Sequence, residues 1–282
     1  MILFITKIEE QSGDNRTGGC FYVCKNGEIK KMRDAELLSD TLSSRYKNIS
    51  TKKLTALLIS RLLLFAFFQA IIALVLKSWN ESEKYWMLSA TLGNIVSIIF
   101  LSALCKIEGN KYLNLLKFDR ARWKKDLPLF SGLTLLIVPI AMGPNYLLSI
   151  WLWGDFSYSY ELLFRSIPHQ ITFILLIAFP VTIAFAELPT YFGYIMPRLQ
   201  KSLKNKWLGM LLPVLFLSIQ HCCLPLIFEF RFILFRGLVF LPFALLLGIT
   251  LWKRPRLLPY FMILHGLMDM QTVIMLIIKP AN

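Results

Sequence analysis

Three long apolar stretches of this chain carry ionisable residues at similar depth: Glu187, His221, His265 and Asp269. A charged group at the centre of a bilayer costs roughly 3 kcal/mol to insert, so such residues mark a candidate functional site. His265 and Asp269 are four residues apart, about one helical turn, which allows the carboxylate to orient the imidazole ring. We therefore treat these four residues as candidate catalytic residues.

This combination of groups is suited to hydrolysis of a peptide bond. A carboxylate beside an imidazole can hold a water molecule and accept its proton. A second imidazole can donate a hydrogen bond to the oxyanion that forms when water attacks a carbonyl. The same residue types could bind zinc, but no H-E-x-x-H spacing is present. We therefore expect catalysis without a metal or other cofactor.

A row of polar side chains follows Glu187 at helical spacing: Tyr191, Tyr194 and Arg198. Such a row predicts a water-accessible groove whose residues bind the substrate. Pro189 lies within the row and has no amide hydrogen. The helix should therefore widen or kink beside Glu187 and release the carbonyl of Phe185 from its backbone hydrogen bond.

The elements that must position these residues are membrane-spanning helices. The chain has 282 residues, of which 56% are hydrophobic, and its mean hydropathy is +0.57. Because about 20 apolar residues cross a bilayer as a helix, we predict an all-α, polytopic membrane helical bundle of about seven transmembrane helices. The predicted spans are about 54–76, 85–105, 127–150, 170–199, 208–228, 233–252 and 257–278.

Residues 1–53 are polar and form a predicted small, soluble, cytoplasmic N-terminal extension. Alternating residues on both sides of Asn26-Gly27 predict a β-hairpin, since this pair accepts the positive φ values of a type I′ turn. A short charged helix is expected over 33–47. The five cysteines of the chain form no disulfide framework, so we expect reduced thiols.

The distribution of basic residues predicts the orientation of the chain in the membrane. The N-terminal arm and every second loop together hold 24 Lys and Arg, whereas the other loops and the C-terminal end hold 6. This asymmetry predicts a multi-pass protein of the cell membrane with a cytoplasmic N-terminus and a C-terminus outside. The net charge of +14 then indicates contact with anionic membrane lipids, and no nucleic-acid partner is expected.

Two further features have predictions based on their position near the membrane surface. Arg61 lies near the cytoplasmic end of the first predicted span, so its side chain is expected to extend to the interface. Residues 107–126 mix aromatic, aliphatic and basic side chains, which predicts an amphipathic segment lying at the interface.

The polar residues of the three spans resemble the motifs of the CPBP (CAAX protease and bacteriocin-processing, or Abi) intramembrane proteases. The family motif E-E-x-x-x-R is matched from Glu187, F-x-x-x-H by the residues that end at His221, and H-x-x-x-N or D from His265. The resemblance covers roughly 127–278. It separates a CPBP-like core, 127–282, from the first two spans and their basic loop, 54–126.

This resemblance implies a CAAX prenyl protease-like, glutamate-dependent peptidase that cuts a membrane-associated peptide or protein without a metal. By this resemblance, Glu187 and His221 would activate a water molecule. His265 and Asp269 would form the side of the site that binds the oxyanion.

The chain departs from the motifs at three positions: Leu188 replaces the second Glu, Phe192 replaces the Arg, and Phe216 lies one place early. Losing the acid and the arginine together removes a charge pair without leaving one charge uncompensated. Two alternatives stay open. One is a catalytically inactive CPBP-like membrane protein that acts as an immunity factor or assembly partner. The other is a transporter with a proton relay, although no inverted repeat is visible.

Overall fold

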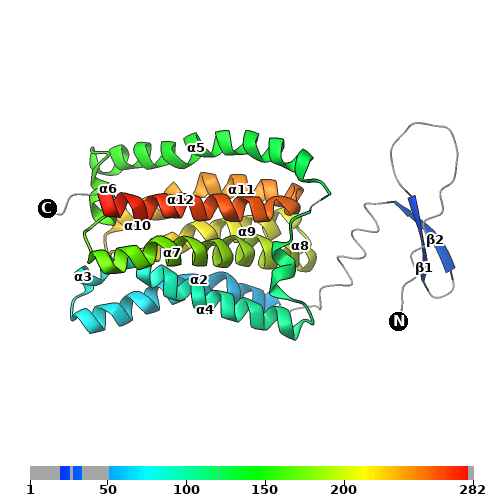
Figure 1. Cartoon of the computed structure of the whole chain (residues 1–282), viewed down its shortest axis with the longest axis horizontal. Helices are drawn as coiled ribbons and strands as arrows, with labels where there is room; N and C mark the ends of the chain where they lie inside the picture. The colour runs from blue at the N-terminus through cyan, green and yellow to red at the C-terminus, as the bar shows by residue number, and fades with distance from the viewer. Residues whose placement is uncertain (1–19, 26–27, 34–50, 120, 279–282) are drawn as a thin grey trace. The chain divides into compact units, whose positions relative to one another are not determined.

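A computed structural model describes residues 20–25, 28–33, 51–119 and 121–278, with side chains from residue 53 onward. The chain divides into two units, residues 1–49 and 50–282, and each is described separately. The first ends four residues before the predicted end of the extension, and the second contains every predicted span. Figure 1 shows the elements of both units.

In the first unit, strands β1 (Cys20–Lys25) and β2 (Glu28–Arg33) pair antiparallel. Lys25 lies opposite Glu28, the register that a two-residue connection requires. The predicted strand pairing is therefore confirmed. The turn residues Asn26-Gly27 and the helix predicted over 33–47 lie outside the described residues.

The second unit is a helical membrane bundle, as predicted. Among residues 51–119 and 121–278, seven helical segments are long and apolar enough to cross a membrane. They are α2 (Thr51–Leu76), α4 (Trp86–Ile107), α5 (Trp123–Trp153), α7 (His169–Leu188) extended by η2 (Pro189–Ile195) and α8 (Met196–Ser202), α9 (Lys206–Ile219), α10 (Phe230–Val239) joined to α11 (Leu241–Lys253), and α12 (Leu258–Ile278).

Short elements connect these segments: α3 (Trp79–Glu83), η1 (Tyr112–Leu116), α6 (Tyr158–Leu163), η3 (Gln220–Cys223) and η4 (Pro255–Leu257). Two predicted spans differ from the structure in detail. The α-helix of the fifth ends at Ile219 and continues as the 3₁₀ turn η3. The sixth is divided at Phe240, where α10 ends and α11 begins. Both interruptions lie close to the candidate site.

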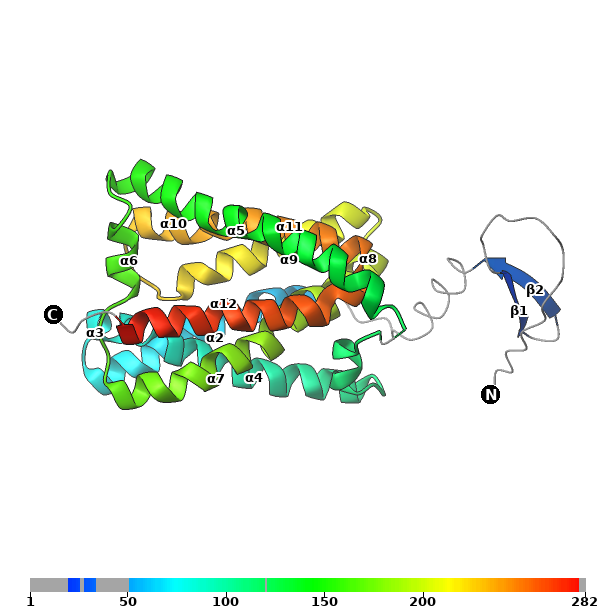
Figure 2. The same ribbon diagram turned by 45° about the horizontal axis from the view of Figure 1, so that its top comes forward.

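Helix α7 lies between α4 and α12, and it packs closely against both (Figures 1 and 2). Gly266 permits the close approach of α12 to α7. A Cβ atom at this position would lie 3.1 Å from the carbonyl oxygen of Pro180 and 3.2 Å from the Cβ of Ala184. Helix α5, by contrast, lies at the edge of the bundle and exposes most of its side chains. Helix α7 therefore has neighbouring helices on two sides.

The basic connections lie together at one end of the bundle. The start of α5 and helix α8 are at this end, whereas α3 and α6 are at the other (Figures 1 and 2). The alternation on which the predicted orientation depends is therefore present in the fold. Which end faces the cytoplasm stays a prediction.

Candidate active site between helices α2, α7 and α12

The backbone opens immediately after Glu187, as predicted from Pro189. Helix α7 ends at Leu188, and residues Pro189–Ile195 form the wider π-helical turn η2. The carbonyl of Phe185, four residues before Pro189, accepts a hydrogen bond from the hydroxyl of Tyr112 in η1. Because π-helical turns are frequent at functional sites, this opening places Glu187 in a region of the helix with an unusual backbone.

Three of the four predicted catalytic residues meet inside the bundle. Glu187 is 1% exposed, and its Oε1 lies 2.8 Å from Nε2 of His265. The carboxylate Oδ2 of Asp269 lies 3.6 Å from the same nitrogen. The predicted meeting of ionisable groups from different spans is therefore present for Glu187, His265 and Asp269. The catalytic roles of these residues stay a prediction.

The fourth residue, His221, is held in one orientation by three contacts. Its Nδ1 lies 2.8 Å from the carbonyl oxygen of Leu217, and its ring stacks on Phe240 at 3.7 Å. Its own carbonyl accepts a hydrogen bond of 3.2 Å from Nε of Arg236. Because a carbonyl can only accept, Nδ1 must carry the proton, and a neutral His221 then has a free lone pair on Nε2.

His221 does not contact Glu187 as His265 does. In the described part of the chain no hydrogen bond joins His221 to the acid directly, whereas Gln220, the residue before it in η3, donates one to Glu187. The two imidazoles are not equivalent in the folded chain.

Arg61 also belongs to the site, and the prediction that it extends to the membrane interface is wrong. Its side chain is 0% exposed. Its Nε lies 2.9 Å from Oε1 of Gln220, its Nη2 lies 2.8 Å from Oδ1 of Asn94, and the same Nη2 lies 3.5 Å from Oε2 of Glu187. These acceptors come from three other helical segments, so the arginine turns inward instead of reaching solvent.

Gln220 is the second residue that sequence reasoning missed. Its Nε2 donates a hydrogen bond of 2.6 Å to Oε2 of Glu187. Its Oε1 accepts hydrogen bonds from Arg61 and, at 3.2 Å, from the hydroxyl of Tyr191. The side chain thus connects the arginine to the acid. The available signal was the presence of Arg61, Asn94 and Gln220 as polar residues within predicted spans, which is itself unusual.

The row of polar side chains after Glu187 does not line a water-accessible groove, and that prediction is wrong. Tyr191 and Tyr194 are 0% and 1% exposed. The hydroxyl of Tyr194 donates a hydrogen bond of 2.7 Å to Oε1 of Glu108, and Arg198 forms an ion pair with the same carboxylate. Glu108 directly follows the last residue of α4, so the end of this helix contacts Tyr194 and Arg198. Their role in substrate binding stays a prediction.

No group of three or more His, Cys, Asp or Glu side chains is arranged to hold a metal ion within residues 53–119 and 121–278. The guanidinium of Arg61 lies 3.5 Å from Oε2 of Glu187, and it would repel a divalent cation bound at that carboxylate. The residues of this site therefore fit a metal poorly. Cys105, Cys222 and Cys223 are free thiols, as predicted.

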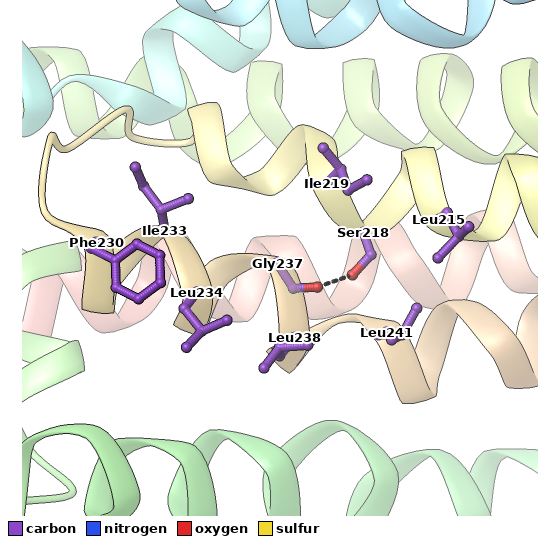
Figure 3. Close-up of a pocket in the computed structure, with 9 residues that line it drawn as sticks. All are labelled: Leu215, Ser218, Ile219, Phe230, Ile233, Leu234, Gly237, Leu238 and Leu241. Atoms are coloured by element: carbon purple, nitrogen blue, oxygen red, sulfur yellow. Dashed lines mark hydrogen bonds between the residues drawn. The ribbon is translucent and has the colours of Figure 1, made fainter.

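A separate pocket of about 290 Å³ lies between α9 and the α10–α11 segment (Figure 3). Its lining is apolar except for Ser218, whose hydroxyl donates a hydrogen bond of 2.6 Å to the carbonyl of Gly237. Ser218 and Ile219 immediately precede η3, which carries Gln220 and His221. The pocket is therefore next to the candidate site in sequence, but it is not lined by the acid or the imidazoles.

Comparisons of the chain with protein-family models, curated proteins and solved structures find no match. The resemblance to the CPBP proteases accordingly depends on the motif residues alone. At the two positions where the chain lacks the motif charges, Leu188 and Phe192 are 0% and 3% exposed. Apolar side chains at these buried positions leave no uncompensated charge behind.

Proposed function

We propose that this protein is an intramembrane peptidase that hydrolyses a peptide bond of a membrane-associated peptide or protein. One observation carries the proposal. Within an apolar helical bundle, the buried Glu187 is hydrogen-bonded to His265, and it also accepts a hydrogen bond from Gln220, the residue before His221 in η3. A buried acid in contact with a proton-carrying ring is the arrangement that general acid–base catalysis requires.

In the proposed reaction, Glu187 and His221 act on a water molecule. The carbonyl oxygen of the substrate takes over the hydrogen bond from Nε2 of His265, and this frees Oε1 of Glu187. The freed carboxylate removes a proton from water as the water oxygen attacks the carbonyl carbon. The nitrogen of the scissile bond then receives that proton, and the C–N bond breaks. His221, with its lone pair on Nε2, supports the water, and Asp269 orients His265.

We place the N-terminus and the basic connections on the cytoplasmic side of the cell membrane. The clustering of those connections at one end of the bundle supports this orientation. The substrate would then reach Glu187 from that side. Headgroups of anionic lipids would contact the same end.

The proposal is tested by comparing cells that produce the wild type with cells that produce Glu187→Ala. The termini of membrane proteins and peptides are labelled chemically and identified by mass spectrometry. We expect termini that appear only with the wild type. Asp126→Asn is the matched control, because Asp126 is also fully buried but pairs with Arg256 at 2.6 Å, away from the site. Identical termini in wild type and Glu187→Ala would refute the peptidase.

A second candidate is a catalytically inactive membrane protein that acts as an immunity factor or assembly partner. The observation in its favour is that both oxygens of Glu187 already accept hydrogen bonds, from His265, Gln220 and Arg61. Such a carboxylate could serve only to join helices. Under this alternative, Glu187→Gln retains the cellular phenotype, since the amide keeps the shape and one acceptor. Loss of the phenotype with intact insertion would exclude it.

A further inference from the structure

Arg61 has more contacts with neutral amides than with the acid it approaches. Two of its nitrogens donate to the amide oxygens of Gln220 and Asn94, at 2.9 and 2.8 Å. The distance to Oε2 of Glu187 is longer, 3.5 Å. The guanidinium also lies 5.0 Å from the ring centre of Phe65 on its own helix. The arginine is thus held in place by other residues and is presented to the carboxylate as a fixed charge.

Gln220 links Arg61 to the carboxylate of Glu187 and so orients that carboxylate. Because its Oε1 is occupied by the Nε–H of Arg61, its Nε2 must point the other way, and there it donates to Oε2 of Glu187 at 2.6 Å. Because Arg61 and Gln220 both donate to Oε2 of Glu187, Oε1 is the oxygen that faces His265. The arrangement therefore distinguishes the two oxygens of one carboxylate.

The charges around Glu187 explain why a permanent cation is needed there. The titratable side chains around it are His265 and Asp269 on α12, His221 on η3 and Tyr191 on η2, while the neutral Asn94 of α4 contacts Arg61. A proton on His265 would be shared by two carboxylates, because Asp269 Oδ2 lies 3.6 Å from the same nitrogen. One further positive charge balances the group, and buried charges need such balance. Arg61 supplies it.

We propose that Arg61 is a positioning residue that keeps Glu187 ionised and, through Gln220, directs Oε1 toward His265. The consequence for catalysis rests on the proposed peptidase function, but the state of the carboxylate does not. The arginine acts from α2, which lies outside the part of the chain that resembles the CPBP proteases.

The state of Glu187 is measured by infrared spectroscopy of the purified full-length protein in lipid nanodiscs. A protonated carboxyl group has a carbonyl stretching band, and the band of Glu187 is the one that disappears in Glu187→Gln. We expect no such band in the wild type. In Arg61→Met we expect the band to appear, and in the double variant Arg61→Met/Glu187→Gln to be lost again.

Arg236→Met is the matched control. Arg236 is also a buried arginine, 5% exposed, but its hydrogen bonds go to the backbone carbonyls of His221 and Leu224. Removing it should therefore produce no band from Glu187. A band already present in the wild type, or no band in folded Arg61→Met, would overturn the proposal.

A second variant tests the same contacts if Arg61→Met does not accumulate as folded protein. In Gln220→Leu the carboxylate loses its 2.6 Å hydrogen bond, so the carboxylate stretching band of Glu187 should shift relative to the wild type. An unchanged carboxylate band would contradict the proposed role of Gln220.

Cleavage assays separate this inference from the peptidase proposal. If the peptidase proposal holds, Arg61→Met lowers kcat more than it raises KM, and Arg61→Lys, which retains the charge, recovers part of the rate. If Glu187→Ala leaves cleavage unchanged while the infrared bands behave as expected, the peptidase proposal fails and the role of Arg61 stands. If Glu187→Ala abolishes cleavage but kcat and KM of Arg61→Met equal those of the wild type, the positioning role fails.

Discussion

Glu108 and Glu187 have side chains that are 4% and 1% exposed and lie beside arginines, and the two arrangements differ in what the arginine contacts. The carboxylate of Glu108, at the end of α4, accepts hydrogen bonds from Nε and Nη2 of Arg198, with a distance of 3.3 Å to Nε. It also accepts a hydrogen bond from the hydroxyl of Tyr194. The guanidinium also lies 3.5 Å from the ring centre of Tyr194. This pair joins α4 to η2 and α8, and the acid faces the arginine directly.

Glu187 lies in α7, the helix that η2 extends, and its carboxylate is bound differently. Neutral amides hold Arg61 so that its Nη2 lies 3.5 Å from Oε2 of Glu187. The nearest ionisable partner of Glu187 is the imidazole of His265, at 2.8 Å. An arginine keeps its proton at any physiological pH, whereas an imidazole gives and takes one near neutrality. The comparison indicates that one arrangement locks helices together, and the other leaves the carboxylate beside a group that can exchange protons.

The largest expected effect concerns the chemistry of Glu187. In Glu187→Gln, the amide cannot accept a proton from water, so kcat should fall by roughly 10³-fold. The variant should still fold, because Arg61 keeps its amide acceptors on Asn94 and Gln220. The rate is measured on a substrate identified from the terminus comparison. Cleavage at the wild-type rate would mean that the site has no acid–base role.

The contacts of Glu108 with Arg198 and Tyr194, called the lock below, should contribute most to stability. Glu108→Gln is expected to lower the free energy of unfolding by about 3 kcal/mol, because the buried Arg198 loses this carboxylate. Glu187→Gln should cost less, about 1.5 kcal/mol, since its arginine is held mainly by amides. Both values come from reversible unfolding in detergent micelles. If Glu187→Gln is the more destabilising, the contrast between lock and site is wrong.

The candidate site depends on the spacing of α7 and α12, whereas the lock does not. Gly266→Val should destabilise the bundle by about 2 kcal/mol, because the added atoms press on Pro180 and Ala184. It should also reduce cleavage by moving His265 away from Glu187. Gly143→Val on α5 is the control, since nothing lies within 4 Å of a Cβ atom there. Equal losses of stability in the two variants would exclude close helix packing as the cause.

The smallest expected effect is at Tyr112, which links η1 to α7 between the two glutamates. Burial raises the pKa of the Tyr112 hydroxyl, so the group stays a neutral donor to the carbonyl of Phe185. Tyr112→Phe should cost about 1 kcal/mol of stability by removing this hydrogen bond. The measurement is the same unfolding experiment. A loss as large as that of Glu108→Gln would show that η1 supports more of the bundle than one bond.

Some features of the site follow from local sequence, and others do not. Pro189 predicted the widened turn, because the missing amide acts on its own helix. The same turn invalidated the predicted groove: a π-helical turn changes which side chains share a face, so spacing counted on an α-helix no longer applied to Tyr191 and Tyr194. Glu108 then accepted the groups that were expected to meet water.

The amino-acid sequence alone determined the seven spans, the widened turn and the depth of Glu187, His221 and His265, because length, apolar content and a missing amide act locally. Tertiary structure alone decided which polar groups meet. The inward turn of Arg61 and the bridge through Gln220 depend on how α2, α4 and η3 rotate against α7. A single polar residue in an apolar helix forms no periodic pattern from which the rotation of the helix could be predicted. Its partners therefore become known only when the helices are packed.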